Sequence, residues 1–457
     1  HPRCIGGFLW VLADEGVKRV DMDGFIDNQG NFGADGIVGP HHEKEGSYYT
    51  IKQLWSPVQV MNTAIDRNFN GKLSVENRYD YLNLNTCRFI WQQVKFPSVT
   101  DASNTTTRIL KQGEVQGSDV AAHGVGVVDI KTSILPEADA LFLTVIDKYG
   151  YELWRWTFPV DKLNRETEQF SASSGRASYT ETEKGITVKA NGRTFVFSKK
   201  DGQLKDVSVN NRKISFANGP RFIGARRADR SLDQFYNHDD EKAKAKDRTY
   251  SEFTDAAVFT KLDVKEEGGN LILTANYKLG NLDKAQWTIH PDGMATLDYT
   301  YNFSGVVDLM GICFDYPEEQ VLSKRWLGAG PYRVWQNRIH GAQYDIWEND
   351  YNDPIPGETF TYPEFKGYFG SVSWMSIRTK EGTISLTNET PDSYIGVYQP
   401  RDGRDRLLYT LPESGISVLN VIPPVRNKVN STDLCGPSSQ PKWVDGSQTG
   451  RLVLRFE

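Results

Sequence analysis

The first 60 residues constrain the fold of this chain more than any other stretch. Residues 4–12 form an almost uninterrupted apolar run with a Gly pair inside it, and such a run is typical of a parallel strand buried on both faces. After a polar loop, Tyr48, Ile51 and Leu54 fall at helical spacing, and Pro57 then ends the helix. The sequence therefore predicts one strand and one helix, a single βα unit of a larger α/β structure.

The chain changes character after this helix. Short β-rich runs alternate with polar turns over about 90 residues, a spacing that predicts an immunoglobulin-like β-sandwich. The predicted strands are residues 73–75, 79–84, 88–91, 127–130, 140–146 and 151–158. The next stretch, residues 166–184, is polar, rich in Ser and nearly free of aliphatic side chains, which is typical of a linker.

The remaining residues read as one long all-β region. Its clearest element is a hairpin with strands at 186–190 and 193–197, because Asn191-Gly192 tolerates the positive φ values of a tight turn. Similar turn signals recur without helical segments of any length, which argues for a large two-sheet sandwich. The predicted domains are a βα unit (1–68), a small sandwich (69–160), a linker (161–184) and a large sandwich (185–457).

Four motifs connect the chain to a known family. They are Gly-Gly-Phe-Leu-Trp at 6–10, Asn-Phe-Gly-Ala-Asp-Gly-Ile-Val at 31–38, Glu-Lys-Glu-Gly-Ser at 43–47, and Gly-Ala-Gly-Pro-Tyr-Arg-Val-Trp-Gln-Asn-Arg at 328–338. The first three resemble the last strand, loop and helix of the catalytic TIM barrel in β-galactosidases of glycoside hydrolase family two. The fourth keeps the register of Gly-x-Gly-Pro-x-Glu-x-Tyr-x-Asp-Arg in that family's C-terminal domain, and Cys435-Gly436 matches a later Cys-Gly pair. This resemblance covers the whole chain and implies that the large sandwich is a galactose-mutarotase-like supersandwich.

Composition excludes several classes of partner. The net charge of -6 is spread along the chain without a basic block, so nucleic acid is not an expected partner. No apolar run reaches the length that crosses a membrane. The four cysteines are far apart and predict buried thiols rather than a disulfide framework. They leave the compartment open, with a periplasmic or secreted bacterial location favoured over a cytoplasmic one.

The resemblance implies a retaining exo-glycosidase that acts on terminal β-D-galactosides. Such enzymes need two carboxyl groups about 5 Å apart, and in this family both are glutamates on earlier barrel strands, upstream of this sequence. Asp14 and Glu15 are adjacent, so only one of them can face a substrate. We therefore expect no catalytic residue in this chain. The expected partners are a missing N-terminal segment or a second chain that completes the barrel, or another copy of this chain, unless the first 60 residues dock onto the sandwich.

Three residues are candidates for binding the sugar, because the active site of a TIM barrel lies at the carboxyl ends of its strands. Trp10 matches the family's Trp that packs against the apolar face of the sugar; the alternative is a core Trp. Asp14 matches an acidic residue that follows that Trp, with a solvated loop carboxylate as the alternative. His41 lies in a barrel loop, where it either contacts sugar hydroxyls or is solvated.

A cation site is the remaining candidate. The chemistry requires no cofactor, but in some relatives a cation beside the sugar is held by a Phe carbonyl and an Asn side chain in Phe-x-x-Asn-Gly. Phe32 and Asp35 occupy these positions here and could hold a monovalent or divalent cation (Na or Mg). The alternative is that Asp35 before Gly36 is a turn former.

Two other functions remain open on the sequence. One is a non-catalytic carbohydrate-binding or structural module. The other is a mutarotase-like epimerase, which would use a His such as His340 with a carboxylate as an acid/base pair. Arg333 stands where the family has Glu, and the stretches around Arg227 and Glu364 also depart from its motifs, which favours a structural role for the C-terminal domain. A module or epimerase would have no use for the opening βα unit, which favours the glycosidase.

Overall fold

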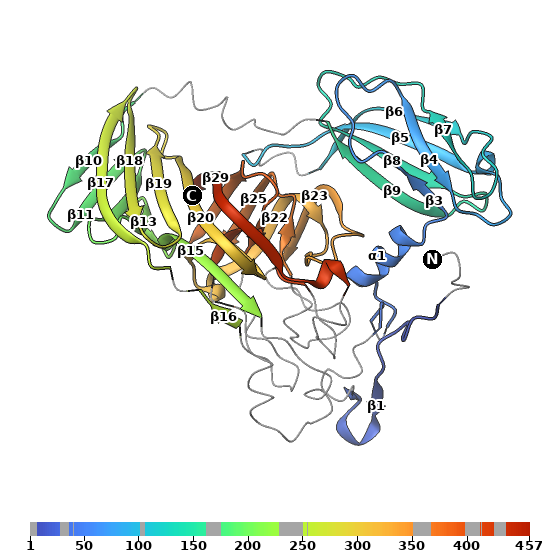
Figure 1. Cartoon of the computed structure of the whole chain (residues 1–457), viewed down its shortest axis with the longest axis horizontal. Coiled ribbons are helices and arrows are strands. Elements are labelled where there is room, and N and C mark those ends of the chain that lie inside the picture. The colour runs from blue at the N-terminus through green and yellow to red at the C-terminus, as the bar shows by residue number, and fades with distance from the viewer. Residues whose placement is uncertain are drawn as a thin grey trace.

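The computed structural model describes residues 7–27, 36–39, 41–100, 106–160, 175–227, 250–253, 255–350, 367–397, 412, 414–424 and 436–457. In these residues the chain is mainly β, with one α-helix, α1 (Gly46–Leu54), between the N-terminal segment and two β-sandwiches (Figure 1). The mainly β fold predicted from the sequence is therefore confirmed. No helix in this part of the chain has both the length and the apolar character needed to span a membrane.

The small sandwich packs a three-stranded sheet against a four-stranded sheet. Its core draws apolar side chains from both sheets, among them Val75, Phe89 and Trp154. The first sheet has the order β3 (Val58–Val60), β4 (Lys72–Asn77), β7 (Val125–Asp129), and the second β6 (Arg108–Gln116), β5 (Arg88–Lys95), β8 (Ala140–Ile146), β9 (Glu152–Pro159).

One predicted strand of the small sandwich does not form. Residues 79–84 run as a loop into a short 3-10 helix, η2 (Leu84–Thr86). The buried amide of Asn77 donates hydrogen bonds to the carbonyls of Leu82, Val120 and Ala121 at 2.9–3.1 Å. These bonds bend the loop back over the sandwich, so its backbone is not available to a sheet.

The large sandwich packs two long sheets face to face around one core. The eleven-stranded sheet consists of β10 (Ser178–Glu181), β11 (Gly185–Ala190), β12 (Arg193–Ser198), β13 (Leu204–Val209), β14 (Arg212–Ile214), β15 (Ala217–Arg227), β16 (Tyr250–Glu252), β21 (Leu309–Asp315), β24 (Phe369–Gly370), β27 (Tyr394–Gly396) and β28 (Ile416–Val421). The nine-stranded sheet has the order β17 (Val258–Glu267), β18 (Asn270–Lys278), β19 (Leu282–Ile289), β20 (Ala295–Val307), β29 (Lys442–Phe456), β26 (Gly382–Asn388), β25 (Trp374–Thr379), β22 (Val321–Gly330), β23 (Gln343–Asp350). Two short 3-10 helices, η4 (Glu318–Gln320) and η6 (Pro437–Ser439), lie in the connections.

Strand β29 lies in the middle of the nine-stranded sheet. It pairs with β20 along the whole of β20, from Ala295 opposite Leu454 to Val307 opposite Lys442, and with β26 on its other side. The red β29 crosses next to the yellow β20 in Figure 1. A strand from late in the sequence thus joins the two halves of this sheet.

The predicted hairpin is confirmed. Strands β11 and β12 pair in antiparallel register with Ala190 opposite Arg193. The two turn residues, Asn191 and Gly192, have φ values of 44° and 76°. Asn and Gly adopt this left-handed conformation more readily than other residues, so the local turn chemistry sets the register here.

The linker expected at residues 161–184 is shorter than predicted. Residues 178–181 form β10, which pairs with β11 at the edge of the eleven-stranded sheet. All four residues are exposed, and an exposed edge strand carries polar side chains that resemble those of a linker. Residues 161–174 lie outside the described residues.

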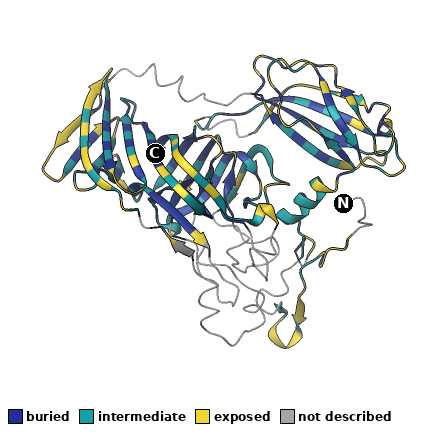
Figure 2. Cartoon of the chain, viewed as in Figure 1, coloured by how far each residue is buried: buried dark blue, intermediate teal, exposed yellow. Residues whose placement is uncertain are grey.

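The N-terminal segment departs from the expected strand. Of the strand predicted at residues 4–12, residues 7–12 form no strand, and residues 4–6 lie outside the described residues. The side chains of Phe8, Leu9, Trp10 and Leu12 are exposed. The described residues supply only a single parallel bridge, between Ala13 and Val38, and a strand forms only where a neighbour pairs along its length. Further along, β1 (Val17–Arg19), a 3-10 turn η1 (Val20–Met22) and β2 (Phe25–Asp27) form a small hairpin that extends away from both sandwiches (Figure 1) and is largely exposed (Figure 2).

The cysteines that the structure describes are free thiols. Cys87 is buried in the small sandwich and Cys313 in the large one, as the sequence predicts. Cys4 and Cys435 lie outside the described residues.

Candidate functional site

The predicted sugar-binding rim is built on a loop of three short backbone segments. Residues 36–39 lie between residues 12–14 and residues 43–45. The N–H groups of Ile37 and Val38 both donate to the carbonyl of Leu12 at 3.0 Å, and the N–H of Asp14 donates to the carbonyl of Val38 at 2.9 Å. On the other side, the N–H of Gly39 donates to the carbonyl of Glu43 at 2.8 Å. These bonds fix the loop even though it contains no regular strand.

The structure places the three candidate binding residues differently. Asp14 is half-buried in this loop, and its Oδ1 accepts a hydrogen bond from the N–H of Gly36 at 2.9 Å. Trp10 is 83% exposed, so its indole is not part of a core in this chain. His41 is also exposed, and its backbone N–H donates to the carboxylate of Glu43 at 3.0 Å. Whether these side chains bind a sugar stays a prediction.

The predicted cation site cannot be placed. Phe32 and Asp35 lie outside the described residues. Within the described ranges, no group of three or more His, Cys, Asp or Glu side chains could hold a metal ion.

A buried carboxyl group beside Asp14 was not predicted from the sequence. Glu45 directly precedes helix α1 and is only 7% exposed. Burial raises the pKa of Glu45 to about 8; the nearby carboxyl group of Asp14 adds to this effect through charge repulsion, and the Arg338 guanidinium opposes it. Glu45 therefore holds a proton at neutral pH, and the two carboxyl groups do not both carry a charge.

Helix α1 docks onto the loop that follows β22. The rings of Tyr49 and Tyr332 pack with centroids 4.9 Å apart. The Gln53 Oε1 atom accepts a hydrogen bond from the N–H of Gly341 at 2.6 Å. A Cβ atom on Gly341 would lie 2.4 Å from the nitrogen of Thr50, so this position requires glycine. The docking outcome expected for the first 60 residues is thus seen for the helix.

The same helix also contacts the small sandwich. Lys52 Nζ lies 2.9 Å from the carboxylate of Glu152 on β9. The two sandwiches also meet directly through a cluster of buried side chains that includes Phe96 and Leu327. At its edge, Asp345 accepts a hydrogen bond from Arg155 at 3.0 Å. Helix α1 is therefore held against both sandwiches.

The motif at 328–338 is part of this junction. It begins at the end of β22, and Val334 exchanges two backbone hydrogen bonds with Tyr368. The indole of Trp335 is buried against the Tyr368 ring, with centroids 5.5 Å apart. The Gln336 amide donates to the carbonyls of Ser438 and Gln440 at 3.0 and 2.8 Å. The motif therefore connects distant parts of the large sandwich.

Only some of the residues that bear on the epimerase alternative are among the described residues. His340 lies in the docking loop, and its carbonyl accepts a hydrogen bond from the hydroxyl of Thr50. The Arg227 side chain and Glu364, which mark the two departures from the family's motifs, lie outside the described residues.

Two joined sandwiches with a docked N-terminal helix define a multi-domain β-sandwich protein. The model of a family described as "Beta galactosidase small chain" matches residues 189–419, about half of the chain. The chain therefore belongs to the beta galactosidase small chain family.

Its relatives are longer than this chain. A beta-galactosidase from Priestia megaterium (strain DSM 319 / IMG 1521) is 21% identical over 426 residues, which are 86% of this chain and 38% of the relative. A beta-galactosidase from Pseudoalteromonas haloplanktis is 19% identical over 397 residues, which are 77% of this chain and 37% of the relative. The structure of a galactose 1-epimerase from Lactobacillus acidophilus NCFM is similar over 62% of this chain and 99% of the epimerase chain, at 11% identity. The TM-score of this match is 0.31, which is too low to support any inference. The chain spans under two fifths of the length of these two beta-galactosidases.

Proposed function

We propose that this chain is the C-terminal part of a retaining exo-glycosidase that hydrolyses terminal β-D-galactosides. The catalytic glutamates belong to a barrel segment outside this chain, on the same polypeptide or on a second one. In the complete protein this chain closes the barrel with its N-terminal rim. It supplies Trp10, Asp14 and His41 to the edge of the sugar site.

The observation that carries this proposal is the exposed apolar surface of the N-terminal segment. Phe8, Trp10 and Leu12 are 105%, 83% and 61% exposed, whereas the neighbouring helix α1 is docked. Contiguous apolar surface of this kind marks an interaction site. The share of the relatives' length that this chain spans, under two fifths, leaves room for a barrel segment that would cover it.

The buried pair of Asp14 and Glu45 fits a supporting role. A protonated Glu45 next to Asp14 limits the negative charge behind the rim. The hydrogen bond from the N–H of Gly36 to Asp14 and the burial of Glu45 help to fix the loop that follows Trp10. Neither carboxyl group is therefore assigned to the reaction itself, which we assign to glutamates elsewhere.

The test compares this chain with the native protein purified from its source. The intact mass of the native protein shows whether a longer or a second polypeptide is present. We expect the native protein to hydrolyse a chromogenic β-galactoside with release of the β-anomer as first product, and this chain alone to give only background hydrolysis.

Two results would contradict the proposal. One is a longer native protein that hydrolyses no β-galactoside. The other is turnover by this chain alone that is abolished by Asp14→Asn or Glu45→Gln, which would place the catalytic pair in the rim.

A further inference from the structure

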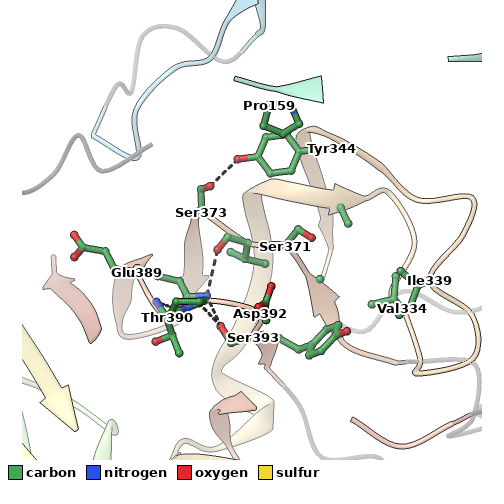
Figure 3. A pocket seen from close by; sticks show the side chains of 16 residues that line it. Pro159, Val334, Ile339, Tyr344, Ser371, Ser373, Glu389, Thr390, Asp392 and Ser393 are labelled. Atoms are coloured by element: carbon green, nitrogen blue, oxygen red, sulfur yellow. Dashed lines mark hydrogen bonds between the residues drawn. The ribbon is translucent and has the colours of Figure 1, made fainter. Parts of the chain in front are cut away.

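A cavity lies where the small sandwich meets the large one, and none of the rim residues lines it. It has a volume of about 350 Å³ and is bounded by the end of β9, by β22 and by the turn between β26 and β27. In Figure 3, Pro159 and Tyr344 lie at one end and Thr390, Asp392 and Ser393 at the other, with Ser371 between them. This volume is within the range of small-molecule binding sites.

The lining of the cavity is amphipathic. One part is apolar and includes Val334, Ile339 and Val372, and the other part presents hydroxyl, amide and carboxyl groups. Those polar residues are Ser371, Ser373, Asn388, Glu389, Thr390, Asp392, Ser393 and the tyrosines Tyr344 and Tyr394. No Lys, Arg or His is among the described residues that line it, so the cavity suits a ligand without negative charge.

The polar side of the cavity is held rigid by its own hydrogen bonds. The Asn388 amide donates to the carbonyl of Val372 at 3.2 Å and to the hydroxyl of Ser393 at 2.9 Å. The N–H of Thr390 donates to Asn388 Oδ1 at 3.1 Å, and the Ser393 hydroxyl donates to the carbonyl of Thr390 at 2.9 Å. Groups fixed in this way lose little conformational entropy when a ligand binds.

Two residues of the cavity have an unfavourable backbone conformation. Ser371 has φ of 49° and Asp392 has φ of 48°. The left-handed region costs an L-residue other than glycine about 1–2 kcal/mol. Strained backbone of this kind occurs at ligand sites as well as in turns. Both side chains are exposed at the cavity, where a ligand could reach them.

A second, smaller hollow lies next to this cavity. It has a volume of about 340 Å³ and shares Glu389 and Pro391 with the first cavity. Glu389 is 12% exposed on its side chain and lies 3.3 Å from Arg451, which belongs to the second hollow. The two hollows therefore lie on either side of Glu389 and Pro391.

We propose that this cavity binds a neutral polyhydroxylated ligand, a sugar of one or two rings, at a site separate from the Trp10 rim. Each sugar ring has an apolar face and a girdle of hydroxyl groups. The apolar wall near Val334 can pack against the apolar face of the ring. The fixed hydroxyl, amide and carboxyl groups of the cavity can form hydrogen bonds with the hydroxyl groups of the sugar. This goes beyond the proposed hydrolysis, because binding here requires neither the catalytic glutamates nor the barrel.

The test is saturation-transfer-difference NMR and calorimetric titration of the whole chain with methyl β-D-galactopyranoside, D-glucose and lactose. We expect at least one of the three sugars to bind. Ser371→Gly should weaken that binding at least tenfold, because it removes a hydroxyl group. It should still fold, since glycine accepts the φ of 49° without strain. Ala329→Leu fills the cavity from β22 and should abolish binding.

Two control variants separate binding in this cavity from binding elsewhere on the chain. Asn211→Gly makes the same kind of backbone change at φ of 66°, in a turn outside the cavity, and should leave sugar binding unchanged. Trp55→Ala, at an exposed Trp just beyond helix α1, should also leave it unchanged. Absence of binding for all three sugars, or binding that survives both Ser371→Gly and Ala329→Leu, would overturn the proposal. Neither result depends on hydrolysis by the complete protein.

Discussion

The hydroxyl of Thr50 donates a hydrogen bond to the carbonyl oxygen of His340 at 2.7 Å, although 290 positions separate the two residues in the sequence. This bond joins helix α1 to the loop at the end of the 328–338 motif. Two stretches that resemble different domains of the same family are therefore in direct contact. The contact accounts for the stable position of an amphipathic helix that has no barrel beside it in this chain.

The first prediction concerns this docked helix. Gln53→Ala removes the acceptor of the Gly341 N–H bond, and loss of a partner for a polar group at a packed contact costs about 1–3 kcal/mol. Urea denaturation should show that loss, and limited proteolysis should release residues 1–60 faster. Gln112→Ala is the matched control, because Gln112 pairs with Gln92 on the exposed surface. Equal effects of the two variants would show that the helix contact contributes nothing to stability.

The second prediction concerns pH. Because burial raises the pKa of Glu45 to about 8, the native state holds a proton that the unfolded chain releases from about pH 4.5 upward. Stability should therefore be fully present below about pH 4.5 and fall as the pH rises toward 8. Glu45→Gln should remove this dependence, as measured by denaturation at a series of pH values.

The control for Glu45→Gln is Glu15→Gln, at an exposed position of the same N-terminal segment. That variant should keep the pH dependence of the unmodified chain. If Glu45→Gln and Glu15→Gln gave the same pH profile, the carboxyl group of Glu45 would not be the source of the effect.

The third prediction concerns Trp10. Because its indole is 83% exposed, Trp10→Ala should leave the melting temperature of this chain nearly unchanged. In the complete protein the same change should lower kcat/KM at least roughly tenfold, about 1.4 kcal/mol of transition-state binding. Trp55→Ala, at an exposed Trp beyond the helix, should leave kcat/KM unchanged. A destabilised Trp10→Ala protein with normal kcat/KM would support a core role instead.

The fourth prediction compares two glycines in the turns on either side of β18. Gly268 and Gly280 have φ of 59° and 66°, so alanine is strained at both. A Cβ atom on Gly268 meets nothing within 4 Å, whereas one on Gly280 would lie 2.1 Å from the nitrogen of Ala257. Gly268→Ala should cost about 1 kcal/mol, and Gly280→Ala should cost at least about 2 kcal/mol more because the backbone must shift. Similar melting temperatures for the two variants would show that the turn relaxes freely.

Features that depend on neighbouring residues could be predicted from the sequence. The β11–β12 hairpin follows from the Asn191-Gly192 turn, and helix α1 follows from the spacing of Tyr48, Ile51 and Leu54. Strand β8 has the bounds that the sequence predicts, because residues 140–146 form a short run of almost entirely apolar side chains. In the structure most of these side chains are buried. In each case the pattern lies within the element itself.

Features that depend on distant contacts could not be predicted. Strand β6 is largely exposed and carries charged residues, so its sequence lacks an apolar face. Strand β10 reads as linker for the same reason. Glu45 lies inside a recognised motif, yet its raised pKa depends on its burial and on the nearby charges of Asp14 and Arg338, which no local pattern connects to it. The apolar residues 7–12 predicted a strand, but a strand also needs a partner.

The central position of β29 has a consequence for synthesis of the protein on the ribosome. Strand β20 gains its neighbour only after residues 442–456 have been made, and until then β20 and β26 both present open edges to other chains. Open edges of this kind template aggregation. A nascent chain that stalls before residue 442 should therefore depend on chaperones, and nonsense mutations in the last strand should give insoluble protein rather than a slightly shortened sandwich.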